Sequence, residues 1–155
     1  MTQFAEVVHC LDIHAPIETV RSQFADLDHH IGNNVHPKLA FQVLEKRANG
    51  ARYTQVVKLL GIKQRDVFER TFDADGGMHD ESVDGFNKGG TINYQFDPVA
   101  DGTRVQIAIR IPVPLLMGFL KPLLISQIRR EVTTAALEDK YDLEVRGYPV
   151  AARPN

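Results

Sequence analysis

Alternating apolar and polar positions run through most of the chain and predict strands. The clearest case is residues 103–113, where every second residue from Val105 to Val113 is apolar. This spacing is typical of a strand with one buried and one solvent-facing side. Similar stretches are found at residues 3–13, 39–46, 51–60, 62–72, 78–83 and 91–96. Short turns, such as Asn49-Gly50, join the last six strands and predict an antiparallel meander.

A helical spacing of apolar residues appears in one long stretch, residues 115–145. Leu120, Leu124, Ile128 and Val132 follow one another at intervals of four and share one face of a helix. Pro122 removes a backbone donor, so either the helix kinks there or residues 115–120 form a separate turn. Two shorter helical pieces are predicted after the first strand, near residues 15–20 and within residues 26–34.

This order of elements predicts an α+β fold. A seven-stranded curved antiparallel sheet would wrap around the long C-terminal helix, with two short helical pieces after the first strand. A single helix is about 10 Å wide and cannot cover seven strands, so part of the apolar face must meet the short helices or line a cavity. We expect one domain over residues 1–146, followed by a C-terminal tail over residues 147–155.

The chain resembles a known superfamily in three places. They are the Ala-Pro-Ile-Glu-Thr-Val start of the first helix at residues 15–20, the strand meander, and the Gln-Ile-Arg-Arg-Glu segment at residues 127–131 of the long helix. Together they resemble the polyketide cyclase/START-like (SRPBCC) superfamily, also called Bet v 1-like or helix-grip proteins, over about residues 4–145. The resemblance implies a hydrophobic cavity between the sheet and the long helix. It implies no single chemistry, because members bind lipids, sterols or polyketides, cyclise polyketides, or assist partner proteins.

The alternation of the strands indicates which side chains face such a cavity. His9 shares its side of the first strand with apolar residues, so burial would keep it neutral and able to orient a ligand or act as a general base. The alternative is a core histidine that bonds to a neighbouring strand or to Tyr94. His36 is expected at the opening of the cavity. The complete set of expected ligand-binding residues is His9, His36, Tyr53, Gln55, Val57, Phe68, Tyr94, Ile109, Leu120, Leu124 and Ile128.

Other groups of polar residues predict no site. His29, His30 and His36 lie within eight residues of one another, and Asp26 and Asp28 are nearby. Adjacent helical residues do not share a face, so we expect solvated loop histidines and no metal site. The acidic residues of the middle strands have no fixed spacing, and the pattern favours a solvated face. They are Asp66, Glu69, Asp80, Glu81 and Asp84.

The composition of the chain limits the kinds of binding partner and the location that the sequence predicts. The formal charge of −2 gives no global field for nucleic acid, and no run of about 18 apolar residues predicts a transmembrane segment. The single cysteine, Cys10, and the absence of a signal peptide favour a cytoplasmic location. We expect no cofactor. The apolar segment from Met117 to Leu124 is an alternative contact for a membrane, a protein or a second copy of the chain.

Three functions agree with these observations. The first is a carrier or sensor that binds one hydrophobic or amphipathic molecule, lipid-like or polyketide-like, inside the cavity. The second is a cyclase or dehydratase for a polyketide-like substrate, in which His9 or Tyr94 moves a proton. The third is an interaction module with a filled core that contacts its partner through the segment from Met117 to Leu124. The sequence contains no Ser-His-Asp arrangement and no phosphate-binding glycine loop, so it predicts neither of these two kinds of catalytic site. Whether the protein is an enzyme of another kind stays open.

Overall fold

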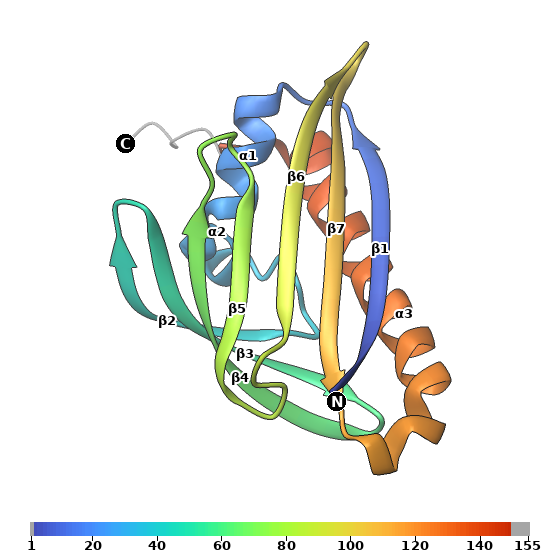
Figure 1. Cartoon of the computed structure of the whole chain (residues 1–155). Coiled ribbons are helices and arrows are strands. Elements are labelled where there is room, and N and C mark those ends of the chain that lie inside the picture. The colour runs from blue at the N-terminus through green and yellow to red at the C-terminus, as the bar shows by residue number, and fades with distance from the viewer. Residues whose placement is uncertain (1, 150–155) are drawn as a thin grey trace.

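The computed structural model describes residues 2–149, and its elements follow the order that the sequence predicts (Figure 1). In chain order they are β1 (Gln3–Ile13), α1 (Ile17–Ala25), α2 (Leu27–Gly32), β2 (Ala40–Arg47), β3 (Gly50–Leu59), β4 (Ile62–Phe72), β5 (Met78–Gly85), β6 (Thr91–Val99), β7 (Gly102–Val113), the 3₁₀ helix η1 (Leu115–Leu120), α3 (Lys121–Tyr141) and the π-helical segment η2 (Asp142–Gly147).

The seven strands form one antiparallel sheet in the order β1-β7-β6-β5-β4-β3-β2. The strands from β2 to β7 pair with their neighbours in sequence, whereas β1 pairs with β7 and places Val7 opposite Ile109. Register shifts interrupt β2 between Val43 and Glu45 and β4 between Val67 and Phe68. Such irregularities increase the local bend of a strand. The curved sheet wraps around α3, which confirms the predicted helix-grip architecture (Figure 1).

The position of Pro122 explains where the long helix begins. Leu115–Leu120 forms η1, and α3 starts at Lys121 with the proline in its first turn. At this position proline loses no intrahelical hydrogen bond. Of the two alternatives that the sequence left open, a kink or a separate turn, the structure has the separate turn. The buried stripe of α3 packs on the sheet and includes Leu124, Ile128, Val132 and Ala136.

The two short helices cover the part of the concave face that α3 leaves open. Phe24 of α1 packs edge-to-face against Phe96 and Tyr94 of β6, with ring centroids 5.4 Å and 6.1 Å apart. Asp26 then caps α2, because its carboxylate accepts a hydrogen bond from the His29 amide at 3.0 Å. This cap ends one helix, starts the next and directs the histidines of α2 toward α3.

The end of the described chain lies against α2. Gly147 ends η2, and the hydroxyl of Tyr148 donates a hydrogen bond to the Asp26 carboxylate at 2.7 Å. The tail expected from the sequence begins at residue 147, and its residues 150–155 lie outside the described residues. The division of the chain at residue 146 stays a prediction.

Candidate functional site

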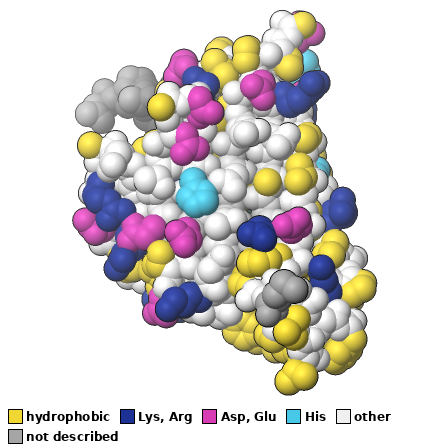
Figure 2. Space-filling model, in the orientation of Figure 1, with side chains coloured by type: hydrophobic (Ala, Val, Ile, Leu, Met, Phe, Trp, Pro, Cys, Tyr) yellow, Lys and Arg dark blue, Asp and Glu magenta, His cyan; other side chains and the backbone are white. Residues whose placement is uncertain are grey.

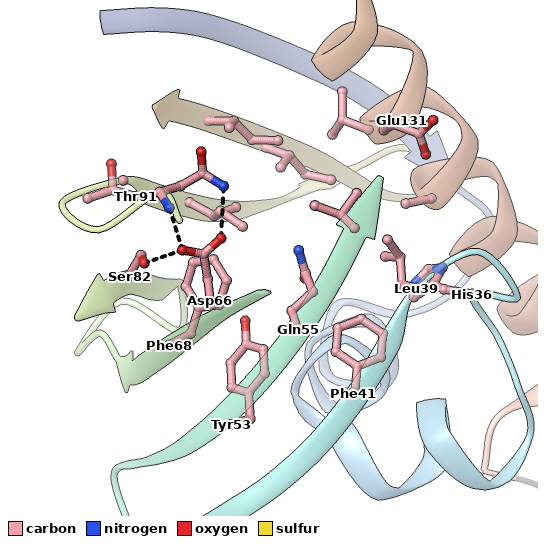
Figure 3. A pocket seen from close by; sticks show the side chains of 18 of the residues that line it. His36, Leu39, Phe41, Tyr53, Gln55, Asp66, Phe68, Ser82, Thr91 and Glu131 are labelled. Atoms are coloured by element: carbon pink, nitrogen blue, oxygen red, sulfur yellow. Dashed lines mark hydrogen bonds between the residues drawn. The ribbon is translucent and has the colours of Figure 1, made fainter. Parts of the chain in front are cut away.

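A cavity of about 160 Å³ lies between the concave face of the sheet and α3, and Figure 3 shows it from close by. Its wall also includes residues from both short helices and from the loop between β5 and β6. Most of the wall is apolar. The apolar lining residues are Phe24, Leu27, Leu39, Phe41, Val57, Leu59, Phe68, Ile92, Ile107, Ile109, Ile111, Ile128, Val132 and Ala135.

Many of the side chains that the sequence assigns to the cavity line it. They are His36, Tyr53, Gln55, Val57, Phe68, Tyr94, Ile109 and Ile128. That any of them contacts a ligand stays a prediction. His9, Leu120 and Leu124 are not among the described residues that line the cavity. His9 lies on β1, which α3 contacts directly. Leu124 is buried in the main core, and Leu120 ends η1.

A buried ion pair stands on the inner face of the sheet. Arg70 donates two hydrogen bonds to Asp80, and both N···O distances are 2.8 Å. The hydroxyl of Tyr53 donates a third to Asp80 at 2.8 Å, and the guanidinium lies 5.7 Å from the ring centroid of Tyr94. We call these four residues the sheet cluster. Burial raises the pKa of Tyr94, and the Asp80 carboxylate adds to this shift, so the phenol stays protonated.

A second carboxylate of the sheet holds the loop between β5 and β6. Asp66 accepts hydrogen bonds from the Ser82 hydroxyl at 3.0 Å and from the backbone amide of Asn87 at 2.6 Å. Its other oxygen accepts from the Asn87 side chain at 2.8 Å, as the dashed lines of Figure 3 show. These bonds fix the loop residues that close this side of the cavity.

A group of titratable side chains closes the opposite side of the cavity, where α2 meets α3. His30 and His36 both face Asp139, and we call these three residues the helix cluster. Their Nε2 atoms lie 2.9 Å and 3.4 Å from Asp139 Oδ1. Burial favours the protonated form of Asp139, but hydrogen bonds from His30 and His36 outweigh it and hold the pKa of Asp139 well below its usual range. Burial also lowers the pKa of His36, and the Asp139 and Glu138 carboxylates outweigh this effect and raise it.

Further hydrogen bonds connect the helix cluster to α1 and η2. The buried amide of Gln23 donates to Asp139 Oδ1 and to Asp142 Oδ2, both at 3.0 Å. His29 Nε2 lies 2.7 Å from Asp142 Oδ2, and its Nδ1 lies 3.1 Å from the amide nitrogen of Asn33. The amide donates to Nδ1, so Nε2 carries the proton and donates to Asp142. The side-chain amide of Gln23 in α1 thus links Asp139 and Asp142 of the C-terminal helical region.

The interpretation of the strand carboxylates as a solvated face is wrong for Asp66 and Asp80. Their exposed fractions are 2% and 0%. In β4 the inward-facing positions are Gln64, Asp66, Phe68 and Arg70, which alternate with exposed or half-buried neighbours. Burial of these polar groups is tolerated because each has charged or polar partners. The sequence argument considered the acidic residues without the arginine on the same side of the strand.

Asp139 is the site residue that the sequence argument missed most clearly, and a signal for it exists. It follows Val132 and Ala136 at helical spacing, so a carboxylate interrupts the apolar stripe of α3. A charged residue in a buried stripe needs a partner. The partners come from α2 and the loop behind it, more than a hundred residues earlier, and no local pattern relates these positions.

Apolar side chains gather on the surface at the start of the C-terminal helical region. Figure 2 shows this patch at the lower right, where η1 and the first turns of α3 lie in Figure 1. Leu116 and Phe119 are the most exposed members, with 92% and 79% of their surface accessible. No described helix is long and apolar enough to pass through a membrane.

The sequence matches no protein-family model and no curated protein. Solved structures, in contrast, match the fold over most of its length. TTHA0849 from Thermus thermophilus has 22% identity and a TM-score of 0.78, with 87% of this chain and 94% of that chain covered. A START superfamily protein from Mycobacterium smegmatis has 16% identity and a TM-score of 0.67, with 84% and 93% covered. The Zhui aromatase/cyclase from a Streptomyces species has 12% identity and a TM-score of 0.76, with 94% and 99% covered.

These identities are low, and what they establish is the architecture. The matched structures also include a ginseng major latex-like protein, at 12% identity and a TM-score of 0.68. The strand order, the position of the two short helices and the long C-terminal helix agree with the resemblance found in the sequence. The chain has the helix-grip fold shared by START-like, aromatase/cyclase and Bet v 1-like proteins.

Proposed function

We propose that this protein binds one small hydrophobic or amphipathic molecule in the cavity between the sheet and α3. The observation that carries the proposal is the cavity itself, an apolar space of about 160 Å³ with polar groups at separate places in its wall. An apolar body with a few fixed polar groups is the usual composition of a small-molecule site. The START-like and major latex-like structures with the same fold support it.

The volume of the cavity limits the size of the molecule. A cavity of about 150 Å³ accommodates a benzene-sized molecule, whereas sites for drug-sized ligands measure roughly 300–1,000 Å³. A ligand of one ring therefore fits this protein with little rearrangement, and a ligand of two rings fits after small movements of the wall. A long acyl chain or a several-ring polyketide requires side chains of the wall to move.

Gln55 is the group that we expect to orient the polar end of the ligand. Figure 3 shows its side chain extending from β3 into the cavity. Unlike the carboxylates of Asp66 and Asp80, its amide makes no side-chain hydrogen bond within the described part of the chain. An amide in such a position offers a donor and an acceptor to a hydroxyl or carbonyl group.

A cyclase-type reaction is the second candidate, because two of the matched structures are aromatase/cyclases and His36 lines the cavity. His9 is not among the described lining residues, and Tyr94 stays protonated at neutral pH, so His36 is the better proton-transferring group. Turnover of a poly-β-ketone that is lost in His36→Gln, while the substrate still binds, would support the reaction.

A pair of variants on one strand tests the binding proposal. Ile109→Trp fills the cavity from β7, whereas Ala108→Trp places the same bulk on the other side of the same strand. The probe is 2-naphthol, a fluorescent two-ring phenol, and circular dichroism checks the fold of each variant. We expect Ile109→Trp to abolish binding and Ala108→Trp to retain it. Unchanged binding by Ile109→Trp would overturn the proposal, and so would an equal loss in both variants.

A further inference from the structure

Three buried side chains from three separate segments converge at one side of the cavity. His30 belongs to α2, His36 to the loop before β2, and Asp139 to the last turns of α3. Their exposed fractions are 8%, 7% and 5%. All three residues also line the cavity.

We propose that His30, His36 and Asp139 bind one divalent first-row transition metal ion, such as Zn²⁺. One nitrogen or oxygen atom of each residue lies within 4.8 Å of the corresponding atoms of the other two. Asp139 Oδ1 is 2.9 Å from His30 Nε2 and 3.4 Å from His36 Nε2. Ligands that surround a zinc ion tetrahedrally, at about 2.0–2.1 Å, lie about 3.3 Å from one another. The two distances from the carboxylate to the imidazole rings are therefore close to those of a coordination shell, and the third separation is no more than 4.8 Å.

The far nitrogens of both histidines prepare the near ones for a cation. His30 Nδ1 lies 2.7 Å from the backbone carbonyl oxygen of Asp26, and His36 Nδ1 lies 3.2 Å from Glu138 Oε1. These oxygens only accept, so each Nδ1 carries a proton and donates it. In a neutral ring Nε2 then holds a lone pair, which points at the Asp139 carboxylate. Metal-binding histidines usually have this second hydrogen bond, because it fixes the tautomer and the orientation of the ring.

The charges around the cluster also call for a cation. Asp139 and Asp142 are both buried and share the amide of Gln23, and Glu138 lies next to them. Asp142 has Arg146 at 3.9 Å and His29 at 2.7 Å as partners. Within residues 2–149, in contrast, the salt-bridge partners of Asp139 and Glu138 are histidines and include no lysine or arginine. Two protonated imidazole rings could supply the positive charge. One divalent ion would replace both protons and satisfy the same three side chains.

The donor set selects the kind of ion. Two imidazole nitrogens and one carboxylate suit zinc and its first-row neighbours, whereas calcium and magnesium prefer shells made of oxygen ligands. Three protein ligands also leave at least one coordination position free, as in catalytic rather than structural zinc sites. All three residues line the cavity, so a small molecule bound there would lie close to the ion. The metal site stands independently of the apolar ligand and is tested with metal alone.

The test uses the full chain without a histidine tag, after treatment with a chelator. Co²⁺ is added as the probe, because its visible absorption reports nitrogen and oxygen coordination, and Zn²⁺ is then added in competition. We expect one Co²⁺ per chain, displaced by Zn²⁺. Asp139→Asn and His36→Gln should each weaken binding by more than about 100-fold. Glu138→Ala, which removes only the acceptor of the His36 Nδ1 hydrogen bond, should weaken binding by about 10- to 100-fold.

A matched control and a second measurement keep the outcome decisive. His14→Gln changes an exposed histidine that precedes α1 and is bonded to the Asp101 carbonyl, and it should bind Co²⁺ like the unchanged chain. X-ray absorption of the zinc-loaded wild-type chain needs no variant and should show two imidazole ligands. Failure of the wild-type chain to bind either metal would overturn the proposal. Binding that survives in both cluster variants, or a zinc spectrum without two imidazoles, would also overturn it.

Discussion

The sheet cluster and the helix cluster each contain a buried carboxylate, and residues of both line the same cavity, but the two clusters differ in how the charge of that carboxylate is balanced. In the sheet cluster, Asp80 receives two hydrogen bonds from Arg70 and one from Tyr53. The arginine is always charged, so the pair is complete at any ordinary pH. In the helix cluster, Asp139 faces two histidines, and its charge is balanced only when these rings hold protons or a metal ion.

The remaining polar atoms show the same difference. Arg70 uses a further nitrogen to donate to the Phe24 carbonyl at 3.2 Å, which links the sheet to α1. Gln23, which supports the helix cluster, has a buried side-chain oxygen without a hydrogen-bond partner among the described residues. Complete satisfaction is typical of a structural network, whereas an incomplete one commonly marks a place that binds something. We infer that the sheet cluster holds the wall of the cavity in place. The helix cluster, in contrast, is the side of the cavity whose charge balance depends on protons or on a bound metal ion.

The largest expected effect is on the sheet cluster. Arg70→Met leaves the fully buried Asp80 carboxylate without its counter-ion. Removal of one partner of a buried pair typically costs about 3–5 kcal/mol of folding free energy. Urea denaturation should show this loss equally with added Zn²⁺ and with chelator, because the sheet cluster needs no metal.

The double variant Arg70→Met/Asp80→Leu is the control for this prediction. It removes both charges, and apolar replacement of a whole buried pair is often close to neutral. We therefore expect it to recover at least half of the stability that Arg70→Met loses. A double variant that is less stable than Arg70→Met would show that the charge of Asp80 was not the cause.

The second effect concerns the helix cluster and depends on metal. At a free Zn²⁺ concentration about 100 times the dissociation constant, binding to the native state alone adds about 2.7 kcal/mol to the free energy of unfolding. We expect this gain in the wild-type chain and, unchanged, in Arg70→Met. Asp139→Asn should show no gain. A zinc effect that disappears in Arg70→Met would mean that the two clusters are coupled rather than independent.

A smaller effect is expected from Tyr53→Phe, which removes one hydrogen bond from Asp80 and keeps both from Arg70. A hydrogen bond to a charged group contributes about 1.5–3 kcal/mol, and the value here should lie near the lower limit because the carboxylate stays paired. Urea denaturation measures the difference. The ring of Phe fills the same space, so a loss as large as that of Arg70→Met would point to disturbed packing instead.

The sequence predicted the architecture better than the clusters, and the reason is physical. Strand alternation and the helical stripe are local patterns, so they placed Tyr53, Ile109 and Ile128 on the correct faces. Pro122 marked the start of α3 for the same reason. The pairing of Arg70 with Asp80 depends on the register between β4 and β5, and the convergence of His30 with Asp139 depends on how α2 packs on α3. Neither follows from spacing along the chain.

The smallest effect is expected from an ion pair with the same geometry on the surface. Arg104 donates to Asp12 at 2.8 Å and 3.0 Å, much as Arg70 does to Asp80, but both partners are about half exposed. Water and salt screen such a pair, and it usually contributes little. Arg104→Met should therefore lower the melting temperature far less than the matched Arg70→Met.

The contribution of this surface pair to folding stability should depend on pH in a defined direction. The hydrogen bond from Arg104 lowers the pKa of Asp12, although partial desolvation opposes the shift. A carboxyl with a lowered native pKa stabilises the fold above its unfolded pKa of about 3.9, and this contribution is lost as the pH falls through the native value. The small difference between wild type and Arg104→Met should thus be present near neutral pH in low salt and disappear in acid or high salt. If Arg104→Met were instead as damaging as Arg70→Met, burial would not be what makes the sheet cluster important, and its distinction from the helix cluster would rest on the arginine alone.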